Sequence, residues 1–244
     1  MKDAARKRLI FALDVDEFAE AERWVKLLYR HVGLFKVGKQ LFTRCGPEVV
    51  HMVRGEGGEV FLDLKYHDIP NTVAMASLEA ARLGARMVNV HALGGSEMMA
   101  RTVAGIDARY PRGDGLRPLL LAVTILTSAS DQTLQEIGIE RPVTEMVPRL
   151  ARLAKQAGMD GVVASPREVP LIREACGPDF LIVTPGVRPA FAALDDQKRV
   201  TTPADAIAAG ADYLVVGRPI AAAADPVAAA ELILEEMAAA LGRG

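Results

Sequence analysis

A run of ten residues, Asp63-Leu-Lys65-Tyr-His-Asp68-Ile-Pro-Asn-Thr72, contains two carboxylates and one ammonium group. It follows the apolar run 60–62, which predicts a buried strand that ends in a loop. Because side chains along a strand alternate between its faces, Asp63 and Lys65 are predicted to point the same way, with Asp68 just past the strand. Neighbouring carboxylates favour the protonated form of a lysine, and a protonated lysine beside a reacting carbon can act as a general acid.

A surface cluster of ion pairs is the alternative interpretation of these charges. Two charged side chains on one face of an apolar strand are costly to bury without a partner or a purpose, which favours a functional site. Lys36 is the charged residue of another apolar run, 33–38. Taken alone, Lys36 could be a lysine that reaches solvent from a strand end. We predict an alternating row of charges, held together without a metal, that consists of Lys36, Asp63, Lys65 and Asp68.

Eight apolar runs, each followed by a helical pattern, would position these side chains. They predict that residues 1–244 form a single-domain (β/α)8 TIM barrel of the α/β class. An open doubly wound sheet is the alternative, but no GxGxxG follows the first strand. The predicted strands are 9–13, 33–38, 60–64, 86–91, 118–126, 161–164, 180–183 and 213–216, and residues 41–54 are predicted to form one helix.

The active site of a barrel lies at the carboxyl ends of its strands. Polar residues gather at these ends, and Asp14 follows the first strand, although a turn or cap residue is the alternative for it. After the eighth strand, Gly217-Arg218 precedes Pro219 and a helical segment. Glycine lets the backbone approach a ligand, helix N–H groups point outward and arginine offers a bidentate fork, so this pair predicts a phosphate site.

A long loop follows the seventh strand, between Pro185 and Thr202. Loops of this length in a compact domain are uncommon unless they are functional. Because it carries Arg188 and Gln197, we predict a lid that closes on a phosphorylated substrate. The alternative interpretation of this segment is a disordered surface loop.

Composition excludes several classes of function. The 29 Lys and Arg residues against 31 Asp and Glu give a net charge of -2, without a long basic run, so no nucleic-acid partner is expected. No apolar run approaches the roughly 20 residues that span a bilayer, and no signal peptide opens the chain, so we expect a cytoplasmic protein without a membrane partner.

Metal chemistry has little support in the sequence. Cys45 and Cys176 lie far apart and predict two free thiols in a reducing compartment. No HxH or HExxH pair is present, so a metal held by histidines is not expected. His91 ends the fourth strand and is interpreted as a structural histidine, and His67 is assigned no chemical role.

The pattern Asp63-x-Lys65-x-x-Asp68-Ile-x-x-Thr72 resembles the signature of the orotidine 5'-phosphate decarboxylases, in particular the bacterial type. The resemblance covers nearly the whole chain. The pieces that accompany the signature are Ala12-Leu-Asp14, Phe35-Lys36-Val-Gly38, Val90-His91-Ala, Leu126-Thr127-Ser128, Thr184-Pro185-Gly186-Val-Arg188 and Val216-Gly217-Arg218-Pro219-Ile220.

This resemblance implies decarboxylation of orotidine 5'-monophosphate to UMP and carbon dioxide, the last step of de novo pyrimidine synthesis, without a cofactor or metal. Lys65 would protonate C6 of the pyrimidine, and Asp63 and Asp68 would crowd the substrate carboxylate. Asp14 and Lys36 would bind the ribose hydroxyls and hold the charge row. The family also implies a homodimer in which residues 68–72 reach into the partner's site. The other substrate-binding residues that the resemblance implies are Ile69, Thr72, Thr127, Pro185, Arg188, Gln197, Gly217 and Arg218.

Two other functions are compatible with such a barrel. A metal-dependent sugar-phosphate lyase or aldolase would use Asp63 and Asp68 as magnesium ligands, and the long loop that carries Gln197 disfavours it. A barrel that binds a nucleotide without turnover would have no need for the proton donor Lys65. The lyase would lose its activity with a chelator, whereas the nucleotide-binding barrel would bind UMP tightly without turnover.

Overall fold

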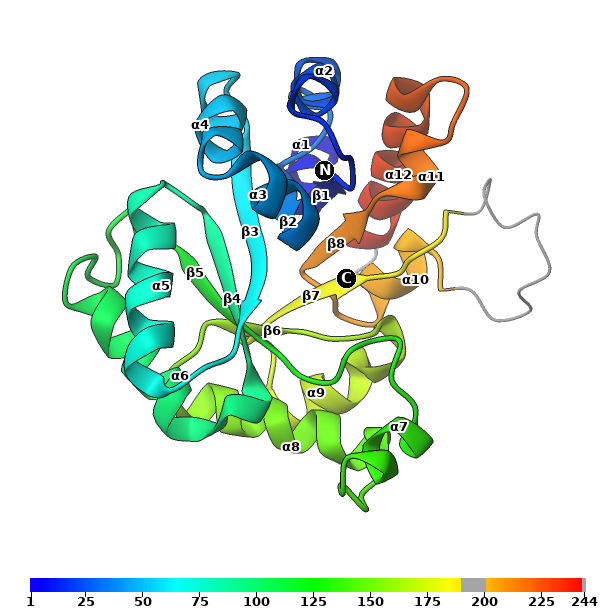
Figure 1. The fold of residues 1–244 in the computed structure, drawn as a ribbon. Helices are drawn as coiled ribbons and strands as arrows, with labels where there is room; N and C mark the ends of the chain where they lie inside the picture. Colours follow the sequence, from blue (N-terminus) through cyan, green and yellow to red (C-terminus); the bar gives the residue numbers. More distant parts are fainter. Residues whose placement is uncertain (190–200, 243–244) are drawn as a thin grey trace.

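A closed barrel of eight parallel strands forms the centre of the molecule (Figure 1). The computed structural model describes residues 1–189 and 201–242. The strands pair in sequence order, and β8 pairs back with β1 to close the barrel. This confirms the predicted (β/α)8 barrel. The strands are β1 (Leu9–Ala12), β2 (Leu34–Gly38), β3 (Glu59–Tyr66), β4 (Met87–His91), β5 (Leu119–Val123), β6 (Gly161–Val163), β7 (Leu181–Pro185) and β8 (Tyr213–Val216).

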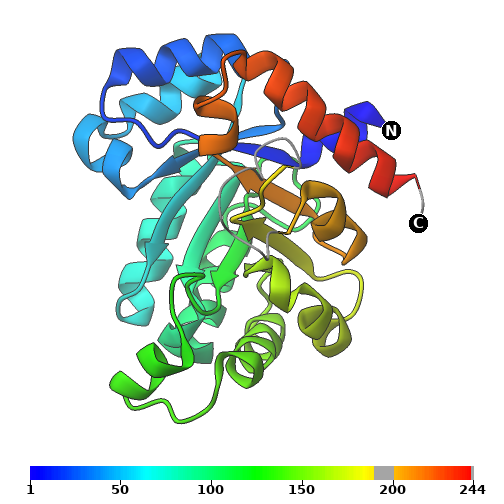
Figure 2. The ribbon, with the colours of Figure 1, turned by 90° about the vertical axis from the view of Figure 1, so that its right-hand side faces the viewer.

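Helices surround the strands, and both termini lie on the same side of the molecule (Figure 2). None of the helices in the described residues is long and apolar enough to cross a membrane. The helices are α1 (Lys2–Arg8), α2 (Phe18–Leu28), α3 (Lys39–Cys45), α4 (Glu48–Gly55), α5 (Pro70–Arg82), η1 (Ala92–Gly94), α6 (Gly95–Asp107), α7 (Asp131–Glu136), α8 (Val143–Gln156), η2 (Pro166–Glu168), α9 (Val169–Cys176), α10 (Pro203–Ala208), α11 (Arg218–Ala221) and α12 (Pro226–Leu241).

Local chemistry explains where the predicted elements differ from the observed ones. The helix predicted over 41–54 is two helices, α3 and α4, because Gly46 adopts a left-handed conformation with φ 65° and Pro47 follows it. The strand predicted over 118–126 ends at Val123, where the chain leaves the sheet. The helix α1 was not predicted, because it is highly charged and buries only Ala5.

Two apolar layers stabilise the barrel. One packs between the strands and the surrounding helices. The other fills the inside of the barrel, where Leu34, Phe61 and Met87 come from the neighbouring strands β2, β3 and β4. Each of these three residues is followed two positions later by a polar one, and strand alternation keeps that polar side chain on the inner side. The three polar residues are Lys36, Asp63 and Asn89.

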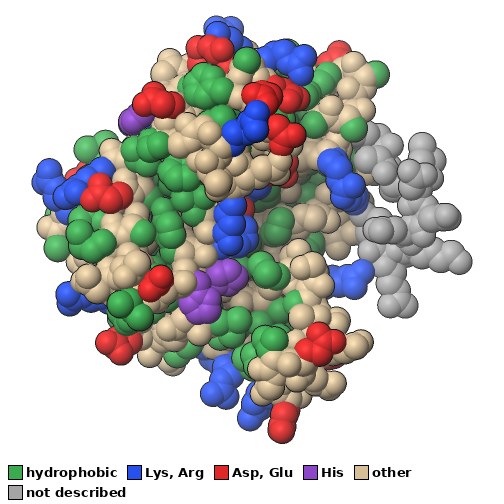
Figure 3. Space-filling model, in the orientation of Figure 1, with side chains coloured by type: hydrophobic (Ala, Val, Ile, Leu, Met, Phe, Trp, Pro, Cys, Tyr) green, Lys and Arg blue, Asp and Glu red, His purple; other side chains and the backbone are tan. Residues whose placement is uncertain are grey.

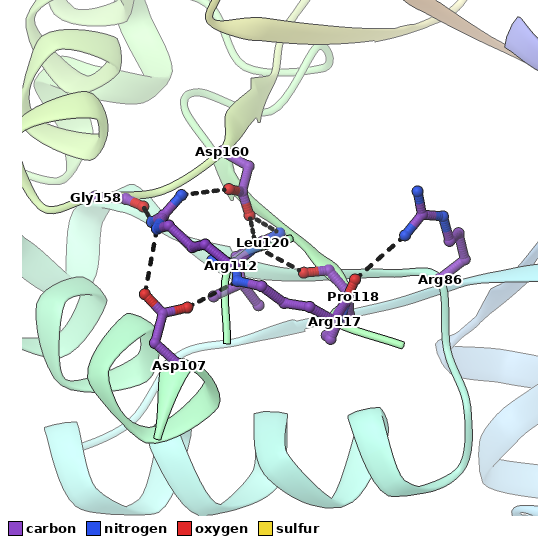
Figure 4. Close-up of polar contacts among 8 residues, drawn as sticks. All are labelled: Arg86, Asp107, Arg112, Arg117, Pro118, Leu120, Gly158 and Asp160. Atoms are coloured by element: carbon purple, nitrogen blue, oxygen red, sulfur yellow. Dashed lines mark hydrogen bonds and ion pairs between the residues drawn. The ribbon is translucent and has the colours of Figure 1, made fainter. Parts of the chain in front are cut away.

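A buried ionic network fixes the opposite, amino-terminal end of the barrel (Figure 4). Asp160, directly before β6, accepts hydrogen bonds from the Leu120 N–H of β5 and from the Arg117 guanidinium, both at 2.7 Å. Arg117 is 6% exposed and also pairs with Asp107 at 2.7 Å. Arg112 joins both carboxylates. This network links the starts of β5 and β6 at the end of the barrel that is opposite to the carboxyl ends of the strands.

Candidate active site

Four charged side chains of alternating sign form a row, hereafter the charge row, across β1, β2 and β3. Asp14 Oδ1 lies 2.9 Å from Lys36 Nζ, which lies 3.7 Å from Asp63 Oδ2. The other oxygen of Asp63, Oδ1, lies 2.6 Å from Lys65 Nζ. Asp14 is held beside Lys36 because the Leu13 N–H donates to the Lys36 carbonyl oxygen at 3.0 Å. The structure therefore brings three of the four predicted charges together and adds Asp14.

The charge row lines a cavity of about 200 Å³ at the carboxyl ends of the strands. The side chains of Lys36 and Asp63 are 13% and 11% exposed, whereas that of Lys65 is 25% exposed. Asp14, at the outer end of the row, is 66% exposed. In this orientation, Figure 3 shows basic and histidine side chains close together near the middle of the molecular face, with acidic side chains above them. The inner charges compensate one another, and the cavity leaves Lys65 accessible to a ligand.

Lys65 reaches Asp63 through a distorted backbone. Lys65 has φ 51°, the single positive value among described residues other than glycine. The β3–β4 pairing shifts here, so that β3 advances from Leu62 to Tyr66 while β4 advances only from Val88 to Val90. The predicted contact between Asp63 and Lys65 is confirmed, but its predicted cause, regular strand alternation, is wrong. A β-bulge and a left-handed residue produce the contact instead.

Sequence reasoning assigned no role to Asn89, which lies at this bulge. Asn89 is 1% exposed. Its Nδ2 donates to Asp63 Oδ1 at 2.6 Å, and its Oδ1 accepts from the Lys65 N–H at 2.8 Å. Its position in the sequence could have pointed to this role. Asn89 follows Met87 by two residues, just as Lys36 follows Leu34 and Asp63 follows Phe61.

Asp68 lies outside the charge row of its own chain, contrary to the prediction from its spacing, whereas the resemblance implied that residues 68–72 reach into the site of a partner subunit. Its carboxylate accepts a hydrogen bond from the neighbouring Ile69 N–H at 2.6 Å. In the described part of the chain it makes no ion pair with Lys65. Asp68, Ile69 and Thr72 are all exposed, because the chain turns outward after β3 and begins α5 at Pro70.

Two histidines flank the inner end of the charge row. The His67 and His91 rings lie with their centroids 5.5 Å apart. Burial, followed by the charges of His67, Lys39 and Lys65, lowers the pKa of His91 from 6.5 to about 4. His91 is therefore neutral at pH 7. No hydrogen bond to its ring is present within the described residues, so its role in packing rests on the ring contact with His67.

A second cavity, of about 620 Å³, opens at the ends of β5, β6 and β7. Thr127, Pro185 and Arg188 line it, as predicted for residues on this rim. The Arg188 N–H donates to the Thr201 carbonyl oxygen at 3.0 Å, which joins the two sides of the long loop. Gln197 lies outside the described residues, and so does most of the predicted lid.

Gly217 and Arg218 lie where β8 returns to β1. A Cβ at Gly217 would lie 3.3 Å from Ala12 Cβ and 3.7 Å from Asp14 Oδ2, so glycine permits close approach beside the charge row. Arg218 is exposed and begins α11. Among the described residues, no group of three or more His, Cys, Asp or Glu side chains could hold a metal ion.

Several known proteins share much of this chain's sequence and its fold. A relative from Syntrophotalea carbinolica, named orotidine 5'-phosphate decarboxylase, is 68% identical over 240 residues, covering 98% of both chains. A relative of the same name from Geobacter sulfurreducens is 67% identical over 238 residues, covering 98% of this chain and 99% of its own. The crystal structure of orotidine 5'-phosphate decarboxylase from Lactobacillus acidophilus is similar with a TM-score of 0.82 and 44% identity, covering 94% of this chain and 98% of that one.

The family model described as "Orotidine 5'-phosphate decarboxylase / HUMPS family" matches residues 7–233, which is nearly the whole chain. The relatives match over almost their full lengths, and the barrel carries the charged residues that the sequence pattern singled out. The chain therefore belongs to the orotidine 5'-phosphate decarboxylase / HUMPS family.

Proposed function

We propose that this protein decarboxylates orotidine 5'-monophosphate to UMP and carbon dioxide, the last step of de novo pyrimidine synthesis. The observation that carries the proposal is the charge row, which presents Lys65 to a cavity with Asp63 at 2.6 Å. Relatives 62–68% identical to the chain are named orotidine 5'-phosphate decarboxylase. A metal-dependent sugar-phosphate lyase, which would need Asp63 and Asp68 as metal ligands, has no such support. Asp63 forms ion pairs with Lys36 and Lys65, and Asp68 accepts a hydrogen bond from the Ile69 N–H of its own loop.

Lys65 is the proton donor of the proposed reaction. The bond between C6 and the carboxylate carbon breaks, the electron pair stays on C6, and carbon dioxide leaves. Lys65 Nζ then gives one proton to C6, which forms UMP, and the amine regains a proton from solvent. A cationic group fixed beside C6 stabilises the negative charge that develops there, without reorganisation during the step.

Asp63 has two roles in this mechanism. It holds Lys65 in place through the contact of Asp63 Oδ1 with Lys65 Nζ. Its negative charge also opposes the substrate carboxylate, and this repulsion is relieved as carbon dioxide departs. A pair of unit charges 4 Å apart contributes roughly 4 kcal/mol at an effective dielectric constant of 20. Enzymes lower barriers by about 8 to 23 kcal/mol, so one contact cannot supply the whole effect.

Binding energy from the rest of the substrate supplies the remainder. We assign the ribose hydroxyls to Asp14 and Lys36, which face the cavity beside Lys65. The pyrimidine lies toward Thr127 and Pro185. The phosphate is assigned to a separate group of residues, which are Arg188, Gln197, Gly217 and Arg218. Arg218 is exposed and makes no ion pair with the described residues, so its guanidinium is available to an anion.

A homodimer would give residues 68–72 a function. These residues leave the site of their own chain, and Ile69 is 68% exposed. Met75 and Leu93, on the segments that follow β3 and β4, are 49% and 40% exposed. These exposed apolar side chains would be buried if a partner subunit packed over residues 68–72. In this arrangement Asp68, Ile69 and Thr72 complete the site of the partner subunit.

Turnover of orotidine 5'-monophosphate by the purified protein tests the proposal directly. Loss of the substrate's ultraviolet absorbance is followed with and without EDTA, and the Lys65→Ala variant, purified identically, controls for contaminating host enzyme. We expect turnover that EDTA leaves unchanged and that the variant lacks. Folded protein that binds UMP and turns nothing over would overturn the proposal and indicate a nucleotide-binding barrel. Loss of activity on chelation would contradict the metal-free mechanism.

A further inference from the structure

Asn89 is a buried amide whose two ends make different contacts with the two central residues of the charge row. The amide nitrogen donates to Asp63 Oδ1 at 2.6 Å. The amide oxygen accepts from the backbone N–H of Lys65 at 2.8 Å. Asn89 is 1% exposed, lies on the inner side of the barrel, and does not line the cavity beside Lys65. It therefore contacts the proposed catalytic groups from behind.

The orientation of this amide is fixed by its neighbours. A backbone N–H can only donate, so the Lys65 N–H requires the oxygen of Asn89 on its side. The nitrogen then faces Asp63, and a carboxylate accepts hydrogen bonds. Aspartate at position 89 would lack the donor, and leucine would lack both groups. Of these three side chains of similar size, only asparagine satisfies both partners.

The backbone contact explains how Lys65 keeps its unusual conformation. At the bulge between β3 and β4, Lys65 is left without a regular strand partner, and its φ of 51° is rare for residues other than glycine. The Asn89 side chain replaces the missing ladder acceptor. The same amide holds Asp63 Oδ1, the atom that Lys65 Nζ contacts at 2.6 Å. One side chain thus fixes the carboxylate and the lysine together.

We propose that Asn89 is a positioning residue of the decarboxylation, which holds Asp63 and the backbone of Lys65 in the geometry that proton transfer to C6 requires. The inference rests on the proposed function. It predicts that Asn89 acts on the chemical step and not on substrate binding, because its side chain reaches the reaction only through Asp63 and Lys65.

The first test compares Asn89→Leu and Asn89→Asp with the wild type. Displacement of reacting groups by about 1 Å can lower a rate about 100-fold, so we expect kcat to fall about 100-fold in both variants. KM and the affinity for UMP, measured by calorimetry, are expected to stay within about threefold of wild type. Thr102→Val is the control, since it removes a buried hydroxyl on α6 whose single hydrogen bond within residues 1–189 and 201–242 goes to the Met98 carbonyl oxygen.

The pH profile separates positioning from a general loss of structure. In Asn89→Asp the introduced carboxyl lies against Asp63, and two such groups share a proton as the pH falls. Its protonated form can again donate to Asp63, so the ratio of variant to wild-type kcat is expected to rise from pH 8 to pH 5. The other titratable or charged groups around this site are Lys36, Lys65, Asp14, His67, His91 and Lys39, and the ratio removes the part of their titration that the two proteins share.

The outcomes are distinct. If the wild-type protein shows no turnover, the proposed function is contradicted. The position of Asn89 is then tested by UMP binding alone, and an unchanged UMP affinity in Asn89→Asp supports a role without contact to the ligand. Active wild type with kcat unchanged in folded Asn89→Asp would overturn the inference. A parallel rise in KM and UMP dissociation constant would also overturn it, since Asn89 would then act on binding. If Asn89→Leu does not fold, the polar and similarly shaped Asn89→Asp carries the test.

Discussion

The Nζ of Lys65 lies 2.6 Å from Oδ1 of Asp63, although the left-handed backbone of Lys65, with φ 51°, interrupts the strand that carries both residues. A regular strand would point the two side chains in the same direction, but it would not fix the distance between their charges. The bulge at the end of β3 brings the ammonium group back over the carboxylate. Backbone strain of this kind persists where surrounding contacts impose it, and it concentrates at functional sites.

Removal of the Lys65 ammonium is expected to abolish measurable turnover. Lys65→Ala leaves no proton donor at C6 and leaves Asp63 without its closest cation. UMP affinity is expected to change much less than kcat, because the phosphate and ribose contacts remain. Steady-state kinetics and calorimetry check both expectations, with Lys26→Ala on α2 as the control lysine. Substantial residual decarboxylation in Lys65→Ala would remove its assignment as proton donor.

Arg218→Ala tests the phosphate assignment. Hydrogen bonds to charged groups contribute about 1.5 to 3 kcal/mol each, so loss of a bidentate contact is expected to lower kcat/KM by about 10²- to 10⁴-fold. The exposed Arg149→Ala on α8 is the matched control and should behave as wild type. Binding of uridine, which lacks the phosphate, should be the same in all three proteins. Near wild-type kinetics in Arg218→Ala would refute the assignment.

The depressed pKa of His91 predicts loss of stability in acid. Its pKa is about 4 in the folded protein against 6.5 ordinarily, so the unfolded chain binds more protons between these values. The free energy of unfolding therefore falls as the pH decreases from 6.5 to 4. His91 is partly exposed, and solvent screening reduces its contribution, so we expect a loss of about 1 kcal/mol at pH 5. Urea unfolding at pH 7 and pH 5 measures it.

His91→Gln is the variant that isolates this contribution from the other titrating groups. It should lose less stability between pH 7 and pH 5 than the wild type does. An equal loss in both proteins would show that His91 is not the group responsible.

The network at the amino-terminal end of the barrel should affect stability but not activity. Asp160→Ala deprives the buried Arg117 of one partner and the Leu120 N–H of its acceptor. Breaking a buried pair in this way is expected to lower the free energy of unfolding by about 3 kcal/mol, with kcat unchanged at 25 °C. Asp3→Ala, which removes only exposed ion pairs, should leave the free energy of unfolding nearly unchanged. Equal melting temperatures in the two variants would contradict the buried network's role.

Sequence periodicity was sufficient to predict the barrel and most of its strands. Apolar runs and helical patterns are local, and strand alternation alone places Lys36 and Asp63 on the inner side of neighbouring strands. Asp14, Lys36, Asp63 and Lys65 were all predicted as site residues, and the structure brings them into one row. That residues 1–244 form one domain stays a prediction, as does the role of Gln197.

Tertiary structure alone decided how Lys65 meets Asp63 and where Asp68 goes. The shift in register between β3 and β4 depends on a strand more than twenty residues away along the chain, so no local pattern around Lys65 contains it. The role of Asn89 arises from that shift, because its amide oxygen accepts the Lys65 N–H at the point where the register between the two strands changes. Asp68 was grouped with the row by its spacing, but the turn into α5 carries it to the surface. Spacing along the chain determined which charged residues were candidates, and long-range strand pairing determined which of them touch.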